Sequence, residues 1–277
     1  MKNRIGLYEK ALPNVMSWSD KFLAAKTAGY DFIEISIDES DARLSRLNYS
    51  TQAIRELNEL QAEYDLPLLS MCLSGHRRFP FGSRDEKTQK KAYEIMEKAL
   101  KLAQKIHLRN IQLAGYDVYY EDRDEHTEKA FLEGLKWAAK RAEYYGIMLS
   151  LEVMDTPFMG TIARAAKYVD LIQSPYLKIY PDVGNLTQFS DDPWSELKTY
   201  HHHFVGIHLK DTLPNQFKCV EFGEGNVHFE MVFETLKTID YTGPLLIEMW
   251  ADNTQSESFE NTVSRIKKAK SWLQKRM

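Results

Sequence analysis

The sequence predicts a single (β/α)8 barrel, in which eight parallel strands alternate with helices. Short apolar runs recur eight times along the chain, and longer segments with helical periodicity lie between them. The chain has 277 residues, close to the ~250 typical of this fold. A composition of 43% hydrophobic and 27% charged residues is that of an ordinary globular domain.

The eight apolar runs are the predicted strands. Most are rich in Ile, Val and Leu, and we interpret them as strands buried on both faces, without polar alternation. They span residues 5–8, 32–37, 66–73, 111–114, 147–153, 177–180, 204–209 and 245–249.

The clearest helical pattern runs over residues 85–107, where apolar side chains form one stripe and lysines and glutamates the other face. Ser83 followed by Glu86 predicts a capping box at its start. Asp192 before Pro193 is a similar start signal for a helical segment over residues 194–203.

An open doubly wound sheet is the alternative architecture. It is disfavoured because no G-x-G-x-x-G pattern follows the first predicted strand, where residues 7–13 read LYEKALP. No Pro/Ser-rich linker interrupts the pattern, so we expect residues 1–277 to form one domain.

Charge and composition limit the partners that we expect. The chain has 36 Lys+Arg and 40 Asp+Glu, a net charge of -4, which argues against nucleic acid or an anionic membrane as its main partner. Charged residues interrupt the start of the chain before an apolar run of signal-peptide length, and no stretch approaches the ~18 apolar residues of a membrane span. With 2 cysteines in no spacing pattern, we expect a cytoplasmic protein.

Four ionisable residues mark the carboxyl ends of the last four predicted strands, where the active sites of such barrels lie. A single acidic residue there is usually a helix cap or an ion-pair partner. Glu152 and Glu248, however, sit within apolar sequence, where an unpaired carboxylate costs several kcal/mol. Together with Asp182 and His208 they predict a cation between them, since three close carboxylates repel one another.

Several longer motifs resemble the L-ribulose-5-phosphate 3-epimerases of bacterial L-ascorbate and L-xylulose utilisation, also called L-xylulose-5-phosphate 3-epimerases, among the xylose-isomerase-like TIM barrels. The resemblance runs nearly end to end. Its motifs are residues 8–13, 70–80, 112–120, 180–186, 222–225 and 246–250.

This resemblance implies that Glu152, Asp182, His208 and Glu248 bind one divalent metal ion. It also implies that Glu152 and Glu248 are catalytic and exchange protons with C3 of a ketose phosphate. A His with three carboxylates suits Mn2+ or Zn2+. We expect a small sugar phosphate as the partner, and a homo-oligomer with a dimer as one candidate state.

The chain departs from the related epimerases of free ketohexoses at two positions. Those enzymes carry a His where this chain has Asn185, and an Arg shortly after the seventh-strand His, where residues 210–214 contain none. The resemblance therefore favours phosphorylated substrates. Candidate substrate-binding residues, any of which could instead be a plain loop or core residue, are His76, Arg77, Asn185, Lys210, Gly223, Gly225 and Trp250.

Three other functions remain open from sequence. The first is an epimerase or isomerase that acts on another ketose or ketose phosphate. A DNA-repair endonuclease on the same barrel would need further His and carboxylate ligands and a basic surface. Three of the chain's 8 His lie together at residues 201–203, in the helical segment before the seventh predicted strand, and we interpret them as structural or solvated. A non-catalytic sugar-binding protein would bind its ligand without exchanging the C3 proton.

Overall fold

The computed structural model describes residues 3–277 and contains eight parallel strands. All eight predicted strands are present within about three residues of their expected limits. Their bounds are β1 (Ile5–Tyr8), β2 (Phe32–Ser36), β3 (Leu68–Leu73), β4 (Asn110–Leu113), β5 (Met148–Glu152), β6 (Leu177–Tyr180), β7 (Ile207–Leu209) and β8 (Leu245–Ile247). Residues 1 and 2, part of the predicted domain, lie outside the described residues.

The strands follow one another around a nearly closed barrel. The sheet order is β6-β5-β4-β3-β2-β1-β8-β7, so β1 pairs with both β2 and β8. The remaining gap, between β6 and β7, is crossed by parallel bridges from Ile179 to Phe204 and from Asp182 to His208. This arrangement confirms the (β/α)8 barrel and excludes the open doubly wound sheet.

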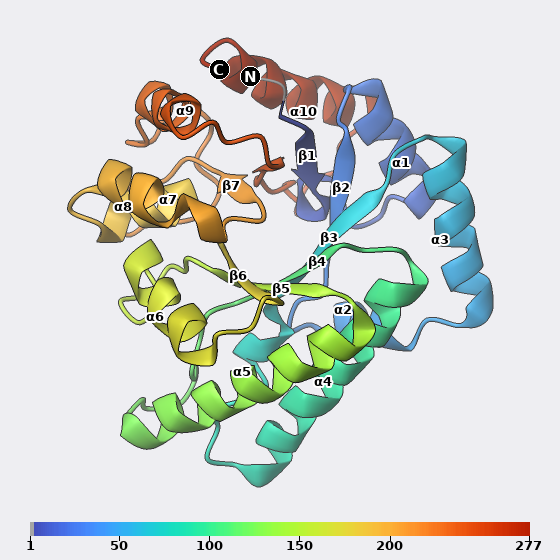
Figure 1. Cartoon of the computed structure of the whole chain (residues 1–277). Helices are drawn as coiled ribbons and strands as arrows, with labels where there is room; N and C mark the ends of the chain where they lie inside the picture. The colour runs from blue at the N-terminus through green and yellow to red at the C-terminus, as the bar shows by residue number, and fades with distance from the viewer. Residues whose placement is uncertain (1–2) are drawn as a thin grey trace.

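Helices surround the strands, as Figure 1 shows, with α4 and α5 side by side and α10 next to α1. Their bounds are α1 (Trp18–Thr27), α2 (Asp41–Leu44), α3 (Thr51–Glu63), α4 (Glu86–Lys105), α5 (Glu125–Tyr145), α6 (Ile162–Ile172), α7 (Val183–Phe189), α8 (Pro193–Tyr200), α9 (Phe229–Thr238) and α10 (Phe259–Gln274). Short 3-10 helices are η1 (Glu9–Ala11), η2 (Ser45–Asn48), η3 (Ser74–Arg77) and η4 (His201–His203). Among residues 3–277, no helix has the length and apolarity to cross a membrane.

One of the two predicted helix starts is confirmed by the structure, and the other is wrong. Asp192 caps α8 with Pro193 in its first turn, as predicted. The capping box of Ser83 and Glu86 is wrong, because α4 begins later. Asp85 is its N-cap, and its carboxylate accepts a hydrogen bond from the Thr88 backbone N–H.

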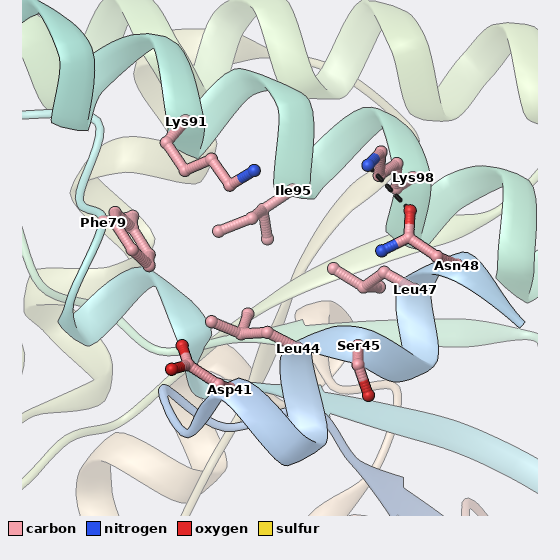
Figure 2. Close-up of a pocket in the computed structure, with 9 residues that line it drawn as sticks. All are labelled: Asp41, Leu44, Ser45, Leu47, Asn48, Phe79, Lys91, Ile95 and Lys98. Atoms are coloured by element: carbon pink, nitrogen blue, oxygen red, sulfur yellow. Dashed lines mark hydrogen bonds between the residues drawn. The ribbon is translucent and has the colours of Figure 1, made fainter.

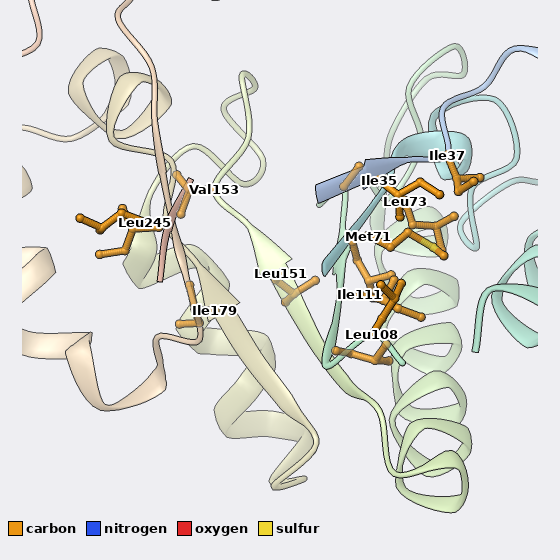
Figure 3. Packing of buried hydrophobic residues seen from close by; sticks show 14 of the residues in the cluster. Ile35, Ile37, Met71, Leu73, Leu108, Ile111, Leu151, Val153, Ile179 and Leu245 are labelled. Atoms are coloured by element: carbon orange, nitrogen blue, oxygen red, sulfur yellow. The ribbon is translucent and has the colours of Figure 1, made fainter. Parts of the chain in front are cut away.

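Side chains of each strand alternate between the helical layer and the barrel interior, as the pleat requires. Apolar side chains such as Ile35, Met71 and Leu151 belong to the large core shared with the helices (Figure 3). The alternate positions Glu34, Ser70, Asn110, Gln112, Ser150 and Glu152 are polar, and all of them are buried. Burial on both faces was predicted correctly, but the absence of polar alternation was wrong.

A small apolar cluster fills part of the interior between β1, β2, β3 and β8. It consists of Tyr8, Phe32, Cys72 and Leu246. Gly6 allows the Phe32 ring to lie across β1, because a Cβ at Gly6 would fall 2.1 Å from that ring. Buried polar side chains of β2, β3, β4, β5 and β7 lie in the interior beside this cluster.

Candidate metal centre and active site

Four strands deliver the predicted ionisable residues to one place. Glu152 is the last residue of β5, His208 is in the middle of β7, and Glu248 directly follows β8. Asp182 follows β6 and caps α7, accepting a hydrogen bond from the Asn185 backbone N–H at 2.8 Å. Because parallel strands present their carboxyl ends on one side, these side chains converge at the barrel mouth.

Glu152, Asp182, His208 and Glu248 form what we call the mouth cluster. Each has a ligating atom within 4.8 Å of those of the other three, and all four residues are buried. His208 directs Nδ1 toward the carboxylates, at 3.2 Å from Glu152 Oε1, 3.4 Å from Glu248 Oε2 and 3.8 Å from Asp182 Oδ2. Three carboxylates and one imidazole nitrogen therefore face a common point.

Lys210, just beyond β7, is the nearest cation to the mouth cluster. Its ammonium lies 3.0 Å from Asp182 Oδ2 and 3.4 Å from Glu248 Oε2. Neither oxygen accepts a hydrogen bond of good geometry within the described part of the chain, although both are buried. One lysine therefore leaves the acidic groups only partly satisfied.

The crowding of carboxylates shifts several pKa values. Burial, together with repulsion from Glu248, raises the pKa of Asp182 well above its usual range, and burial raises the pKa of Glu152. Burial alone would lower the pKa of His208, but Glu34 and Glu248 raise it well above its ordinary value. Burial alone would raise the pKa of Glu248, but Lys210 and His208 lower it. Without a bound ion, the protons at this site therefore tend to stay on Asp182, Glu152 and His208 rather than on Glu248.

The donor set suits a divalent cation. Carboxylate oxygens with one imidazole nitrogen are ligands that Mn2+ and Zn2+ accept, and a doubly charged ion would replace the protons that the acidic groups otherwise retain. The buried oxygens without hydrogen bonds, Asp182 Oδ2 and Glu248 Oε2, lie where such an ion would use them. The mouth cluster can therefore hold a metal ion.

Sequence reasoning missed Glu34, which is completely buried in β2 beneath His208. Its Oε1 lies 2.9 Å from His208 Nε2, and its Oε2 accepts a hydrogen bond from the Ser70 hydroxyl at 2.6 Å. Glu34 could have been found by the same pattern that identified Glu152 and Glu248, which is a carboxylate within an otherwise apolar strand.

Two candidate substrate residues after β3 differ in placement. His76 points into the helical layer, where its Nε2 lies 3.2 Å from the Ala92 carbonyl oxygen; burial lowers the pKa of His76 to about 4. Arg77 donates to the Tyr116 hydroxyl at 3.2 Å, and its guanidinium lies 4.9 Å from the centre of the Tyr119 ring.

Three further candidates have protein partners. Asn185 is buried, and its side-chain amide donates to the Val153 carbonyl oxygen at 2.8 Å. Trp250 lies edge-on to Tyr8, with ring centres 6.2 Å apart, and 5.9 Å from the Lys210 ammonium. All three residues thus lie close to the mouth cluster: Asn185 and Lys210 contact Asp182, and Trp250 lies beside Lys210.

The two glycines after β7 donate to a carboxylate of the protein itself. Asp211 Oδ2 accepts hydrogen bonds from the backbone N–H groups of Gly223 at 2.8 Å and Gly225 at 3.1 Å. A Cβ at Gly225 would lie 2.0 Å from Asp211 Oδ1, so glycine permits this close approach. These N–H groups already have an anionic partner.

Other candidate features lie apart from the mouth cluster. The residues at 201–203 form η4, in which His201 and His202 are exposed to solvent and His203 lies 3.9 Å from Asp170 on α6. A pocket of about 200 Å3 lies between η2 and α4 (Figure 2), where Leu47 and Ile95 face one another and Lys98 donates to Asn48. None of the predicted site residues line this pocket.

Comparison with known proteins agrees with the barrel fold. Residues 22–276 match the family model described as xylose isomerase-like TIM barrel. SgbU of Escherichia coli (strain K12) is 46% identical over 284 residues, covering 100% of this chain and 98% of the relative. The L-ribulose-5-phosphate 3-epimerase UlaE of Salmonella paratyphi A is 45% identical over 273 residues, covering 99% of this chain and 94% of UlaE.

Solved structures share the fold at much lower identity. A structure of L-ribulose 3-epimerase has a TM-score of 0.80 at 16% identity, covering 99% of this chain and 94% of that one. The IolI protein with a binding zinc atom has a TM-score of 0.80 at 18% identity, with coverages of 98% and 97%. On the strength of its full-length relatives, the chain belongs to the L-ribulose-5-phosphate 3-epimerase family of the xylose isomerase-like TIM barrels and is a carbohydrate epimerase, an enzyme of the isomerase class.

Proposed function

We propose that this protein is a metal-dependent 3-epimerase that interconverts L-ribulose 5-phosphate and L-xylulose 5-phosphate. The observation that carries the proposal is the mouth cluster, in which three buried carboxylates and an imidazole converge at the active-site end of the barrel. The L-ribulose-5-phosphate 3-epimerases that resemble the chain over nearly all of its length support the choice of substrate.

Two of the mouth-cluster carboxylates would move protons. Inverting C3 of a 2-ketose requires a base that removes the C3 proton from one face and an acid that returns a proton to the other. Glu152 comes from β5 and Glu248 from the end of β8, so the two carboxylates approach from different sides of the barrel.

Glu152, Asp182, His208 and Glu248 would hold the metal ion, which we propose to be Mn2+ or Zn2+. When bound, such an ion supplies positive charge that stabilises the enediolate left after proton removal. Lys210 contributes a further positive charge beside Asp182 and Glu248. Trp250, in the loop after β8, and Asn185, on α7, would line the sugar site.

The phosphate would bind at Arg77. Gly223 and Gly225 donate to Asp211, and Lys210 is paired with the mouth cluster. Arg77 also has protein partners, Glu39 at 3.7 Å and the Tyr116 hydroxyl, but its buried Nε makes no hydrogen bond within residues 3–277. Lys218, in the loop after β7, has no ion pair among residues 3–277. Lys218 is exposed as a residue, but partial burial of its ammonium lowers the pKa of Lys218, and repulsion from the nearby Arg77 lowers it further. An anion bound between Lys218 and Arg77 would relieve this repulsion.

Solvent-exchange NMR tests the reaction. The Mn2+- or Zn2+-loaded protein is incubated with L-ribulose 5-phosphate in D2O, and deuterium at C3 is followed together with formation of L-xylulose 5-phosphate. We expect C3 deuterium in both epimers. Tight binding of the sugar without deuterium at C3 would instead identify a non-catalytic sugar-binding protein.

The kinetics of two variants test the phosphate assignment. One charge-assisted hydrogen bond contributes ~1.5 to 3 kcal/mol, so Arg77→Met is expected to lower kcat/KM for the pentulose 5-phosphate ~10- to 100-fold. The free pentulose should be turned over at the parent rate. The control is Arg78→Met, because Arg78 pairs with Asp41 on the exposed surface. Equal losses with both substrates would contradict the assignment.

A further inference from the structure

Glu34 has no role in the proton transfers described above, yet it occupies a site that is costly for a carboxylate. It is fully buried in the barrel interior, and within residues 3–277 no Lys or Arg forms an ion pair with it. Its two oxygens contact the Ser70 hydroxyl and the imidazole of His208. The unfavourable desolvation free energy of the Glu34 carboxylate is therefore offset chiefly by its contact with His208.

His208 uses its two ring nitrogens in opposite directions. Nδ1 points toward the carboxylates of the mouth cluster, whereas Nε2 lies 2.9 Å from Glu34 Oε1. Only a nitrogen without a proton can bind a metal ion, and a carboxylate attracts the proton of the nitrogen that it faces. Nδ1 faces carboxylates as well, those of Glu152 and Glu248, but a metal ion bound between them would engage these oxygens. With an ion in place, Glu34 favours the tautomer with hydrogen on Nε2 and a free lone pair on Nδ1.

The surroundings also hold the ring in place. The Tyr180 ring centre lies 4.7 Å from that of His208, and the Tyr8 ring centre lies 6.4 Å away on another side. Ser70 fixes the far oxygen of Glu34 at 2.6 Å, so the carboxylate itself has little freedom. Ser70, Glu34 and His208 thus form one continuous chain of hydrogen bonds that ends at Nδ1.

We propose that Glu34 is a positioning residue that fixes the tautomer and direction of His208, and so makes Nδ1 the nitrogen donor of the metal centre. This inference rests on the metal centre of the proposed function. Partners of this kind typically change metal affinity 10- to 100-fold when they are removed.

The first experiment measures Co2+ affinity from the visible absorption of the bound ion, in the parent protein and in Glu34→Gln. Glutamine keeps the size of the side chain but removes the charge, so we expect Co2+ binding about 10- to 100-fold weaker. The matched control is Glu9→Gln, which removes another fully buried carboxylate that does not contact His208. It should bind Co2+ as the parent does.

A second variant and a second measurement cover the case in which Glu34→Gln does not fold. Ser70→Ala removes one hydrogen bond of Glu34 and should weaken Co2+ binding in the same direction by a few-fold. Nitrogen-15 NMR of the Zn2+-loaded parent should show the His208 proton on Nε2, with a strongly downfield proton resonance.

The possible outcomes distinguish a failure of the Glu34 positioning role from a failure of the proposed metal centre. Co2+ binding by Glu34→Gln and Ser70→Ala at parent affinity, or an Nδ1-protonated His208 in the loaded parent, would overturn the positioning role and leave the metal centre intact. A parent protein that binds no Co2+, Mn2+ or Zn2+ would overturn both.

Discussion

Two buried clusters of charge near the carboxyl ends of the strands differ in their balance. The first, which we call the Glu9 cluster, places one carboxylate among three cations: Lys21, Arg43 and Arg46 lie 2.7 to 2.8 Å from Glu9. The mouth cluster has the opposite excess, with three carboxylates served by His208 and the adjacent Lys210.

The difference indicates what each cluster is for. Burial alone would raise the pKa of Glu9, but Lys21, Arg46 and Arg43 outweigh it and lower the pKa to about 2. In the mouth cluster the pKa values of Asp182 and Glu152 move upward instead. A satisfied carboxylate stabilises the fold, whereas an excess of carboxylates leaves room for a ligand.

The largest expected effect is on catalysis at the mouth cluster. Glu248→Gln should reduce epimerisation by ~10²- to 10⁴-fold, the usual contribution of a general acid or base, and by more if metal binding is also weakened. Steady-state rates at saturating metal, from each epimer in turn, measure this loss. Glu260→Gln, on the exposed first turn of α10, is the control. A Glu248→Gln variant with normal metal content and a near-parent rate would refute the two-base mechanism.

A substitution in the Glu9 cluster should lower the stability of the fold and leave metal binding unchanged. Glu9→Gln leaves three cations around a neutral amide, and breaking a buried ion pair in this way costs about 3–5 kcal/mol. Urea denaturation measures the free energy of unfolding, and Co2+ titration should show parent affinity. A loss of stability below about 1 kcal/mol would mean that the Glu9 cluster is not structural.

The contribution of Glu9 to stability should also depend on pH. Since the pKa of Glu9 falls from 4.5 to about 2 on folding, its contribution is present above pH 4.5 and is lost as the pH falls through 2. This difference corresponds to about 3 kcal/mol. Stability is measured from pH 6 to pH 2 in the parent and in Glu9→Gln. The gap between them should narrow on acidification, and a constant gap would contradict the low pKa.

Adding a metal ion should stabilise the mouth cluster by a smaller amount. At an ion concentration about 100 times the Kd, binding raises the free energy of unfolding by ~2.7 kcal/mol, because only the folded chain assembles the site. Thermal unfolding with and without Mn2+ or Zn2+ measures the shift. His208→Ala should lose most of it, and an unchanged Tm in the parent would argue against a metal site.

The fold and the mouth cluster could be predicted because they depend on local patterns. Apolar runs separated by helical segments predicted the barrel, and the position of a polar residue at a strand end predicted its place at the mouth. Glu34 was missed because it lies within its strand, at a position directed into the interior. Its partner, His208, is 174 residues away in the sequence, so no local pattern joins them.

The substrate contacts were harder to predict for a related reason. A basic or glycine residue after a strand can serve a ligand or the protein, and only the packing decides which. His76 turns toward Ala92, and the N–H groups of Gly223 and Gly225 turn toward Asp211. These partners depend on long-range packing that the sequence pattern does not report.

Lys210 determines how far the acidic cluster depends on a bound ion. A positive charge already stands beside Asp182 and Glu248, supplied by the chain itself. Burial alone would lower the pKa of Lys210, but these carboxylates raise it, so the ammonium persists at neutral pH. The chain therefore supplies part of the positive charge that its own acidic cluster needs, and the fold does not depend on a bound ion alone to offset the repulsion between these carboxylates.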